Sequence, residues 1–171
     1  MSGSTPFPLA QRLAIMLPVS IFFLVLDQWS KIWAVASTMG QPPRTYGAIF
    51  TLTYAQNMGA WGSLGATWPD PVRYTVLSVL PALVLLGLAI YALKDAEIGA
   101  AEVTACALVV AGGTGNLIDR FQLGYVRDFL YVGYGPIGTN IFNVADAVVM
   151  AGLGVLLLKN LQTYLASRKA A

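Results

Sequence analysis

The sequence contains no histidine, and this absence excludes several kinds of active site at once. Serine–histidine and cysteine–histidine pairs need an imidazole base, and His-ligated zinc sites need an imidazole ligand. The single cysteine, Cys106, lies inside an apolar run. It cannot form a disulfide within the chain, and we interpret it as a small buried hydrophobic residue. The chemistry of this chain therefore depends on other side chains.

Charged residues are also scarce. Only 11% of the 171 residues are charged, whereas 57% are apolar. A water-soluble domain usually carries about 25% charged residues, because its surface has to be solvated. A chain of this composition cannot cover its own surface in water, so we expect membrane lipid to cover part of it. The net charge of +2, without a cluster of Lys and Arg, leads us to expect no nucleic-acid partner.

Four apolar segments are candidates for membrane-spanning helices, each of which needs about 20 mostly apolar residues. They lie at about 13–36, 72–93, 103–117 and 142–165. The second contains Pro81, which a membrane helix tolerates because neighbouring helices satisfy the freed backbone groups. The first has no cleavage site after it, so we interpret it as a permanent helix and not as a signal peptide. The sequence therefore predicts an all-α polytopic membrane protein with a single domain over 1–171.

The connections on one side of these spans are long, at about 40–71 and 119–141. Each contains an alternating, β-like run, Thr51–Ala55 in the first and Tyr125–Val132 in the second. We therefore expect a small sheet that caps one membrane face.

With four spans, both termini lie on the side away from these connections. Lys and Arg are equally divided, with five towards each side. If Lys31, Arg120 and Arg127 belong to a site, the remaining positive charge favours cytoplasmic termini.

Four of the eight acidic residues lie in or against the apolar spans. An ionised group at the bilayer centre costs about 2.5–3.5 kcal/mol, so each of these acids is a candidate functional residue. The four are Asp27, Asp119, Asp128 and Asp146. Asp27 and Lys31 are four residues apart and share one helix face, which favours a structural ion pair.

The acids nearer the other spans have two interpretations each. Asn116, Asp119 and Arg120 share one helix face, where they form either a packed helix end with an Asp–Arg pair or a substrate-binding group. Asn143 and Asp146 match a capping box, and the same helix N-terminus also favours an ionised catalytic carboxylate.

Asp128 has the weakest structural interpretation, because it lies in the middle of a predicted strand, where Asp is rare. Arg127 then points to the opposite face of the strand. Without histidine, two carboxylates that share one proton can still hydrolyse a peptide. The ionised acid activates water, and the protonated acid polarises the carbonyl and protonates the leaving amine. Asp128 and Asp146 are the pair that we expect to do this.

Five short motifs in this chain resemble those of prolipoprotein signal peptidase, the signal peptidase II family. They are Asp27-Gln-x-x-Lys31, Asn57-x-Gly-Ala60, Gly112-x-x-Gly-Asn-x-x-Asp-Arg120, Val126-x-Asp-Phe129 and Phe142-Asn-x-Ala-Asp146. Each motif alone is weak, but the five occur in the family's order and extend over nearly the whole chain.

The resemblance implies four membrane helices with cytoplasmic termini, a small periplasmic β-cradle and a short periplasmic helix. It implies an aspartic endopeptidase of the bacterial inner membrane, blocked by globomycin, that works as a monomer without metal or cofactor near the outer membrane face. The substrate is a prolipoprotein with diacylglycerol on its cysteine, cut just before that cysteine. The implied catalytic residues are Asp128 and Asp146; the implied substrate-binding residues are Asn57, Gly59, Asn116, Arg120 and Asn143; the implied supporting residues are Asp27, Lys31, Asp119 and Ala145.

Three residues depart from the family pattern. Met58 and Trp61 differ from what the Asn57 motif leads us to expect, and Arg127 stands where an apolar residue is common. We assign all three to the loop that covers the substrate, where they affect its motion and the choice of substrate.

Three other functions remain as alternatives. Buried acids with a lysine could form a proton- or ion-coupled carrier, although no internal repeat is visible. A serine–lysine peptidase would use Lys31 with Ser30 or Ser63, but Ser30 and Lys31 face different sides of a helix, and Ser63 lacks a full Gly-x-Ser-x-Gly motif. A metal-dependent lipid transferase would need several acids on one helix, and here they are spread over separate segments.

Overall fold

The structure of this chain is a computed structural model that describes residues 7–95 and 97–170. In chain order its elements are α1 (Leu9–Thr38), β1 (Arg44–Tyr46), β2 (Phe50–Asn57), α2 (Asp70–Tyr74), α3 (Leu80–Lys94), α4 (Ala100–Leu123), β3 (Val126–Tyr134), β4 (Ile137–Gly138) and α5 (Val144–Ala170). A 3-10 turn, Trp61–Ser63, follows β2, and a π-helical turn, Thr75–Val79, joins α2 to α3. Four helices in the described part of the chain are long and apolar enough to cross a membrane. The expected architecture, four such helices with a small sheet, is confirmed.

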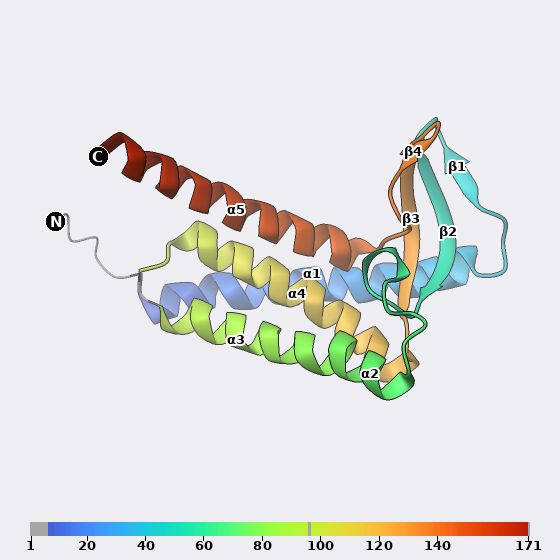
Figure 1. Cartoon of the computed structure of the whole chain (residues 1–171), viewed down its shortest axis with the longest axis horizontal. Helices are drawn as coiled ribbons and strands as arrows, with labels where there is room; N and C mark the ends of the chain where they lie inside the picture. The colour runs from blue at the N-terminus through green and yellow to red at the C-terminus, as the bar shows by residue number, and fades with distance from the viewer. Residues whose placement is uncertain (1–6, 96, 171) are drawn as a thin grey trace.

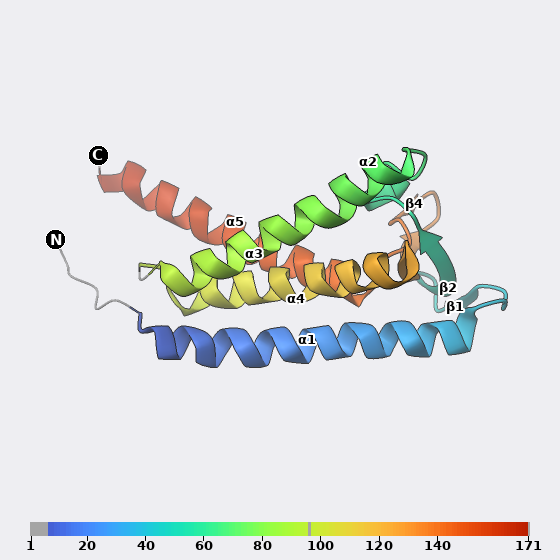
Figure 2. The same cartoon turned by 90° about the horizontal axis from the view of Figure 1, so that it is seen from below.

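Helix α4 occupies the centre of the bundle, with α1, α3 and α5 around it (Figures 1 and 2). Two glycines explain how closely its neighbours approach. A Cβ on Gly112 would collide with the backbone carbonyl of Ala145 in α5, and a Cβ on Gly115 would collide with the carboxylate of Asp27 in α1. Small residues at helix contacts allow backbones to approach in this way within a membrane. The glycines of α4 therefore bring the N-terminal end of α5 and the middle of α1 to the same place.

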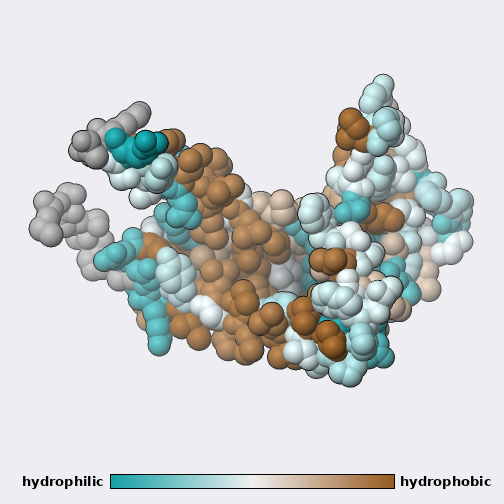
Figure 3. Space-filling model, in the orientation of Figure 1, coloured by the Kyte–Doolittle hydropathy of each residue, from teal (hydrophilic) through white to brown (hydrophobic). Residues whose placement is uncertain are grey.

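The outward faces of the other helices are apolar. Phe22 on α1, Leu83 on α3 and Leu157 on α5 are each about 60% exposed or more. Figure 3 shows such side chains gathered over the helices, with a more polar surface over the sheet. Water would not cover this surface without a large hydrophobic cost, whereas a bilayer would.

The four strands form an antiparallel sheet in the order β1-β2-β3-β4 at one end of the bundle (Figure 1). Ala55 of β2 lies opposite Asp128 of β3, and an irregularity between Leu52 and Ala55 shifts the register. Leu130 of β3 also pairs with Phe142, just before α5. These contacts hold the middle of β3 against the start of α5.

Several boundaries differ from the expected ones. Helix α4 continues to Leu123, six residues beyond the predicted third span, because a regular helix runs to the left-handed Gly124. Asp119 and Arg120 therefore lie on a helix and not in the following connection. The short helix implied by the family resemblance is here the single 3-10 turn Trp61–Ser63.

Pro81 produces a local change of helix type. The π-helical turn Thr75–Val79 comes directly before it. Proline lacks an N–H group and its ring crowds the preceding turn, and a widened turn relieves both problems. The second span is therefore continuous from Asp70 to Lys94 despite the proline.

Candidate active site

Asp128 lies on β3 with its carboxylate directed between two amides. Asp128 is only 2% exposed. Asn57 Nδ2, at the end of β2, donates to Oδ2 of Asp128 (3.0 Å). Asn143 Nδ2, just before α5, donates to Oδ1 (2.7 Å). Asp128 is therefore held by neutral donors and has no cationic partner within ion-pair distance among the described residues.

Asp146 lies in the first turn of α5 and forms the predicted capping box with Asn143. The backbone N–H of Asp146 donates to Oδ1 of Asn143 (3.0 Å), and the backbone N–H of Asn143 donates to Oδ2 of Asp146 (3.1 Å). Asn116 Nδ2, on α4, donates to the other oxygen of Asp146 (2.8 Å). The capping box is therefore confirmed, and the catalytic interpretation of Asp146 stays a prediction.

Asn143 connects the two acids. Its Oδ1 accepts the backbone N–H of Asp146, so its amide nitrogen must face the other way. That nitrogen donates to Asp128 and to Oδ1 of Asn116 (3.0 Å). One buried side chain thus contacts the helix that carries Asp146 and the strand that carries Asp128.

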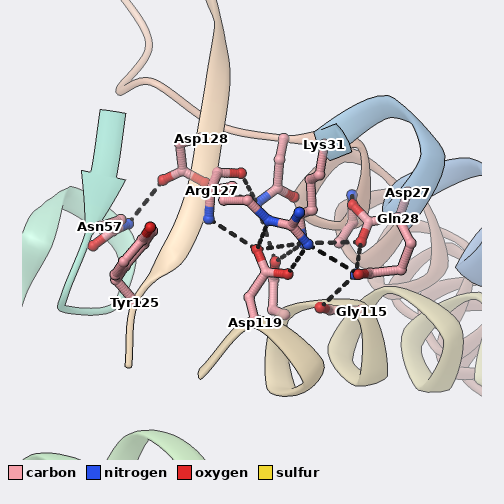
Figure 4. A network of polar contacts seen from close by, with 12 residues as sticks. Asp27, Gln28, Lys31, Asn57, Gly115, Asp119, Tyr125, Arg127 and Asp128 are labelled. Atoms are coloured by element: carbon pink, nitrogen blue, oxygen red, sulfur yellow. Dashed lines mark hydrogen bonds and ion pairs between the residues drawn. The ribbon is translucent and has the colours of Figure 1, made fainter. Parts of the chain in front are cut away.

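A buried charge cluster lies next to these acids and consists of Asp27, Lys31, Asp119 and Arg127 (Figure 4). Lys31 Nζ is 2.8 Å from Oδ2 of Asp27, as the spacing predicted, and 3.5 Å from Asp119. Arg127 forms an ion pair with Asp119 at 2.6 Å and also donates to Gln28 Oε1 (3.0 Å). Two acids and two cations balance one another, which is the condition for burying charge without a large penalty.

The cluster corrects two expectations. Asp119 pairs with Arg127 and Lys31, so the Asp–Arg pair that we considered at the end of the helix does not involve Arg120. Arg127 does not lie in the loop over the substrate; it points from β3 into the protein, on the face opposite Asp128 (Figure 4). Strand alternation predicted that Arg127 and Asp128 face opposite sides of β3. It did not predict that the partner of Arg127 is Asp119 on α4.

The cluster also positions the start of α5. Oδ1 of Asp27 accepts the backbone N–H of Ala145 (2.9 Å), which lies next to Asp146 in the chain. Ala145 is fully buried, and its carbonyl lies against Gly112. Asp27 and Ala145 therefore fix the position of the helix end from which Asp146 projects.

Arg120 connects α4 to the loop after β2. One guanidinium nitrogen of Arg120 donates to the carbonyl of Gly59 (3.0 Å), while its Nε is buried without a hydrogen-bond partner among the described residues. The backbone N–H of Gly59 donates to Oδ1 of Asn57 (3.0 Å), which directs the amide nitrogen of Asn57 toward Asp128. A chain of hydrogen bonds thus connects Arg120, the loop after β2 and Asp128.

A cavity of about 610 Å³ opens beside Asp128 along the sheet. Uncharged polar side chains line much of it, among them Thr51, Thr53, Thr139 and Asn140. These residues were not among the site residues predicted from the sequence. The alternation of Thr51, Thr53 and Ala55 in a β-like run was a usable signal for one wall, whereas Thr139 and Asn140 carry no comparable local pattern.

The environment of Asp128 changes its acidity. Burial, followed by the nearby charge of Asp146, raises the pKa of Asp128 from 3.8 to about 6. A carboxylic acid with such a pKa remains protonated under mildly acidic conditions.

The serines of the alternative serine–lysine mechanism are not bonded to the lysine. Ser30 Oγ donates to the carbonyl of Asp27, and Ser63 lies on the wall of the cavity. The hydrogen bond and ion pairs of Lys31 go to Asn116, Asp27 and Asp119. In the part of the chain that the structure describes, no group of three His, Cys, Asp or Glu side chains gathers in a metal-binding arrangement.

Comparison with known proteins identifies the family. A family model described as Signal peptidase (SPase) II matches residues 19–162. The chain belongs to the signal peptidase II family. The lipoprotein signal peptidase of Streptococcus thermophilus (strain CNRZ 1066) is 36% identical over 147 residues, which cover 84% of this chain and 91% of the relative. That of Gloeobacter violaceus is 34% identical over 145 residues, 84% of this chain and 80% of the relative.

Solved structures agree with this membership in the signal peptidase II family. A bacterial membrane enzyme determined by the in meso method at 1.9 Å resolution superposes with a TM-score of 0.72 at 26% identity, over 87% of this chain and 94% of that one. A second bacterial membrane enzyme, at 2.3 Å, superposes with a TM-score of 0.74 at 24% identity, over 88% and 89% of the two chains, and shows the shared fold. The chain is therefore a multi-pass membrane peptidase, and a carrier is not favoured.

Proposed function

We propose that this chain removes the signal peptide from prolipoproteins that carry diacylglycerol on their cysteine, cutting just before that cysteine. The catalytic type is aspartic, with Asp128 and Asp146 as the dyad. One observation carries the proposal: Asn143 brings acids from a strand and from a helix together, and one of these acids, Asp128, lines the cavity. The names of the relatives, lipoprotein signal peptidases, support the substrate class.

The two acids have different roles in this proposal. Asp146 accepts a hydrogen bond on each carboxylate oxygen and lies at a helix N-terminus. In this proposal it is the acid that removes a proton from the attacking water. Asp128, with its pKa raised to about 6, is the protonated acid that polarises the scissile carbonyl and then protonates the leaving amine. A water-poor site strengthens this difference, because it penalises two adjacent negative charges.

The surrounding polar groups bind the substrate backbone. In addition to its bond to Gly59, Arg120 has a buried Nε–H that can donate to a peptide carbonyl. The remaining groups of the proposed binding site are Asn57, Gly59, Asn116 and Asn143, which surround the dyad. The supporting residues are Asp27, Lys31, Asp119 and Ala145.

The site lies where the membrane meets water. The dyad is at the junction of the apolar helices and the sheet, so an apolar signal peptide can remain in lipid while its cleavage site reaches Asp128 (Figure 1). We place this chain, as one membrane domain, in the bacterial inner membrane, with cytoplasmic termini and with the sheet and site at the outer face. It acts as a monomer in contact with lipid, without metal or cofactor.

The test is cleavage of a synthetic diacylglyceryl-modified prolipoprotein by the purified full-length protein. Asp128→Asn and Asp146→Asn are compared with the wild type, and Asp70→Asn, at an exposed Asp outside the site, is the matched control. We expect both dyad variants to lose cleavage and the control to retain it, with no effect of EDTA. Cleavage near the wild-type rate by either folded dyad variant would contradict the aspartic mechanism.

A further inference from the structure

The amide of Asn116 lies between Lys31 and the dyad. Oδ1 of Asn116 accepts from Lys31 Nζ (3.0 Å) and from Asn143 Nδ2 (3.0 Å), and its own Nδ2 donates to Asp146 (2.8 Å). A lysine ammonium carries donors and no acceptor, so it can face only the oxygen of an amide. A flipped Asn116 would place its N–H groups against the ammonium and its oxygen against a carboxylate. Lys31 thus determines which atom Asn116 presents to Asp146.

The position of Lys31 is itself fixed. Its side chain is fully buried between Asp27 and Asp119, and Asp27 also holds the start of α5 through Ala145. Lys31 forms no hydrogen bond or ion pair with Asp128 or Asp146, and it does not line the cavity. The charge of Lys31 acts on Asp128 at longer range, whereas its hydrogen bond reaches the dyad through Asn116, which bonds to Asp146.

We infer that Lys31 is a positioning residue of the dyad, which orients the Asn116 amide so that Asp146 receives a hydrogen bond from its N–H group. This inference rests on the proposed aspartic function and assigns a task to a residue remote from the substrate. The charged groups around Asp146 are Asp128 from β3, Arg120 from α4, and Lys31 with Asp27 from α1. Of these, Lys31 is the one that bonds to Asn116.

Two charge-balanced double variants separate this task from simple charge neutralisation. Asp27→Asn/Lys31→Met removes one ion pair of the cluster and leaves Asp119 with Arg127. Asp119→Asn/Arg127→Met removes the other pair and leaves Lys31 on Asp27 and Asn116. Each retains an equal number of buried acids and cations, and replacing a buried pair in this way often leaves stability unchanged. They differ in whether position 31 donates to Asn116.

The readout is the pH profile of kcat and kcat/KM on the diacylglyceryl-modified prolipoprotein. For Asp27→Asn/Lys31→Met we expect kcat to fall about ten- to hundredfold with little change in KM, the loss of one charge-assisted hydrogen bond at the reacting centre. We also expect the acidic limb of the profile to move up by about one pH unit. Asp119→Asn/Arg127→Met leaves the hydrogen bond from Lys31 to Asn116 in place, so it should not move the acidic limb, whatever its effect on kcat.

A conservative variant gives a rescue test in the same background. Asp27→Asn/Lys31→Gln keeps an N–H donor at position 31 without charge, so it should recover part of the rate lost with methionine. Equal rates for the methionine and glutamine variants, or equal losses in the two double variants without a shift of the acidic limb, would overturn the inference.

The wild-type protein supplies a readout that does not depend on any variant folding. In NMR spectra, the Asn116 side-chain N–H protons should show contacts to the β-protons of Asp146 and none to the ε-protons of Lys31; the reverse pattern would overturn the inference. Failure of the wild type to cleave, or cleavage by Asp128→Asn, would instead contradict the proposed function. A wild type that cleaves, with inactive dyad variants and double variants that behave alike, would contradict the inference alone.

Discussion

The four acids in or against the membrane spans form two pairs with different partners, and the Asn116 side chain lies between the pairs. Asp27 and Asp119 are bonded to cations, Lys31 and Arg127. Asp128 and Asp146 are bonded to side-chain amides and backbone N–H groups. The cations balance the charges of Asp27 and Asp119 and occupy their oxygens, whereas Asp128 lies between neutral donors and its pKa is raised to about 6. This difference is why we propose the second pair, and not the first, as the catalytic one.

The largest effect on stability is expected from breaking the cation-paired acids unevenly. Lys31→Met leaves Asp27 and Asp119 with Arg127 alone, and removing one partner of a buried ion pair costs about 3–5 kcal/mol. We expect a correspondingly lower unfolding temperature in a thermal shift assay. Adding Asp27→Asn should restore most of it, and unchanged stability of Lys31→Met would show that the cluster is not charge-coupled.

The next effect concerns Asp128 and pH. Because the folded protein raises its pKa from 3.8 to about 6, the associated stability is fully present below pH 3.8 and is lost as pH rises through 6. The shift corresponds to about 3 kcal/mol. Asp128→Asn, which cannot ionise, should become more stable than the wild type above pH 6, as measured by unfolding at pH 5 and pH 8. In the wild type, kcat/KM should decrease with rising pH over the same pH range in which stability is lost.

A smaller effect should follow when the packing that brings the two pairs together is disturbed. Gly115→Ala places a methyl group against the carboxylate of Asp27, and overpacking of this kind costs about 1–3 kcal/mol. Gly154→Ala is the matched control, since a Cβ there meets nothing within 4 Å. We expect Gly115→Ala to unfold at a lower temperature and Gly154→Ala to unfold at or above the wild-type temperature; equal behaviour would argue against close packing at α4.

The smallest effect is expected at an acid outside both pairs. Asp70 forms an ion pair with Arg73 at 2.6 Å, but its side chain is 85% exposed. Exposed ion pairs contribute less than about 1 kcal/mol. Asp70→Asn should therefore change the unfolding temperature little. A large decrease in unfolding temperature would mean that this exposed ion pair stabilises the protein as much as the buried ones do.

The local parts of this arrangement were predictable from the sequence. The spacing of Asp27 and Lys31 predicted their ion pair, Asn143 and Asp146 matched a capping box, and strand alternation placed Arg127 opposite Asp128. Each of these depends on the period of a single element, which the sequence displays directly.

Contacts between elements were beyond the reach of such periods. The ion pair between Asp119 and Arg127 joins α4 to β3. Thr139 and Asn140, which line the cavity, lie in the connection between β4 and α5. The orientation of the Asn116 amide depends on three partners, Lys31 of α1 and Asn143 and Asp146 at the start of α5. Such features follow from tertiary packing, which no local pattern encodes.

The most direct test replaces each of the four acids, Asp27, Asp119, Asp128 and Asp146, by asparagine, one at a time, and measures both prolipoprotein cleavage and unfolding temperature. The account predicts that Asp128→Asn and Asp146→Asn remain folded and lose cleavage by a factor on the order of 10³ or more. It predicts that Asp27→Asn and Asp119→Asn lower the unfolding temperature, with cleavage retained where the protein is folded. Cleavage by either dyad variant, or equal loss of cleavage in all four variants with unchanged stability, would contradict the division between the two pairs.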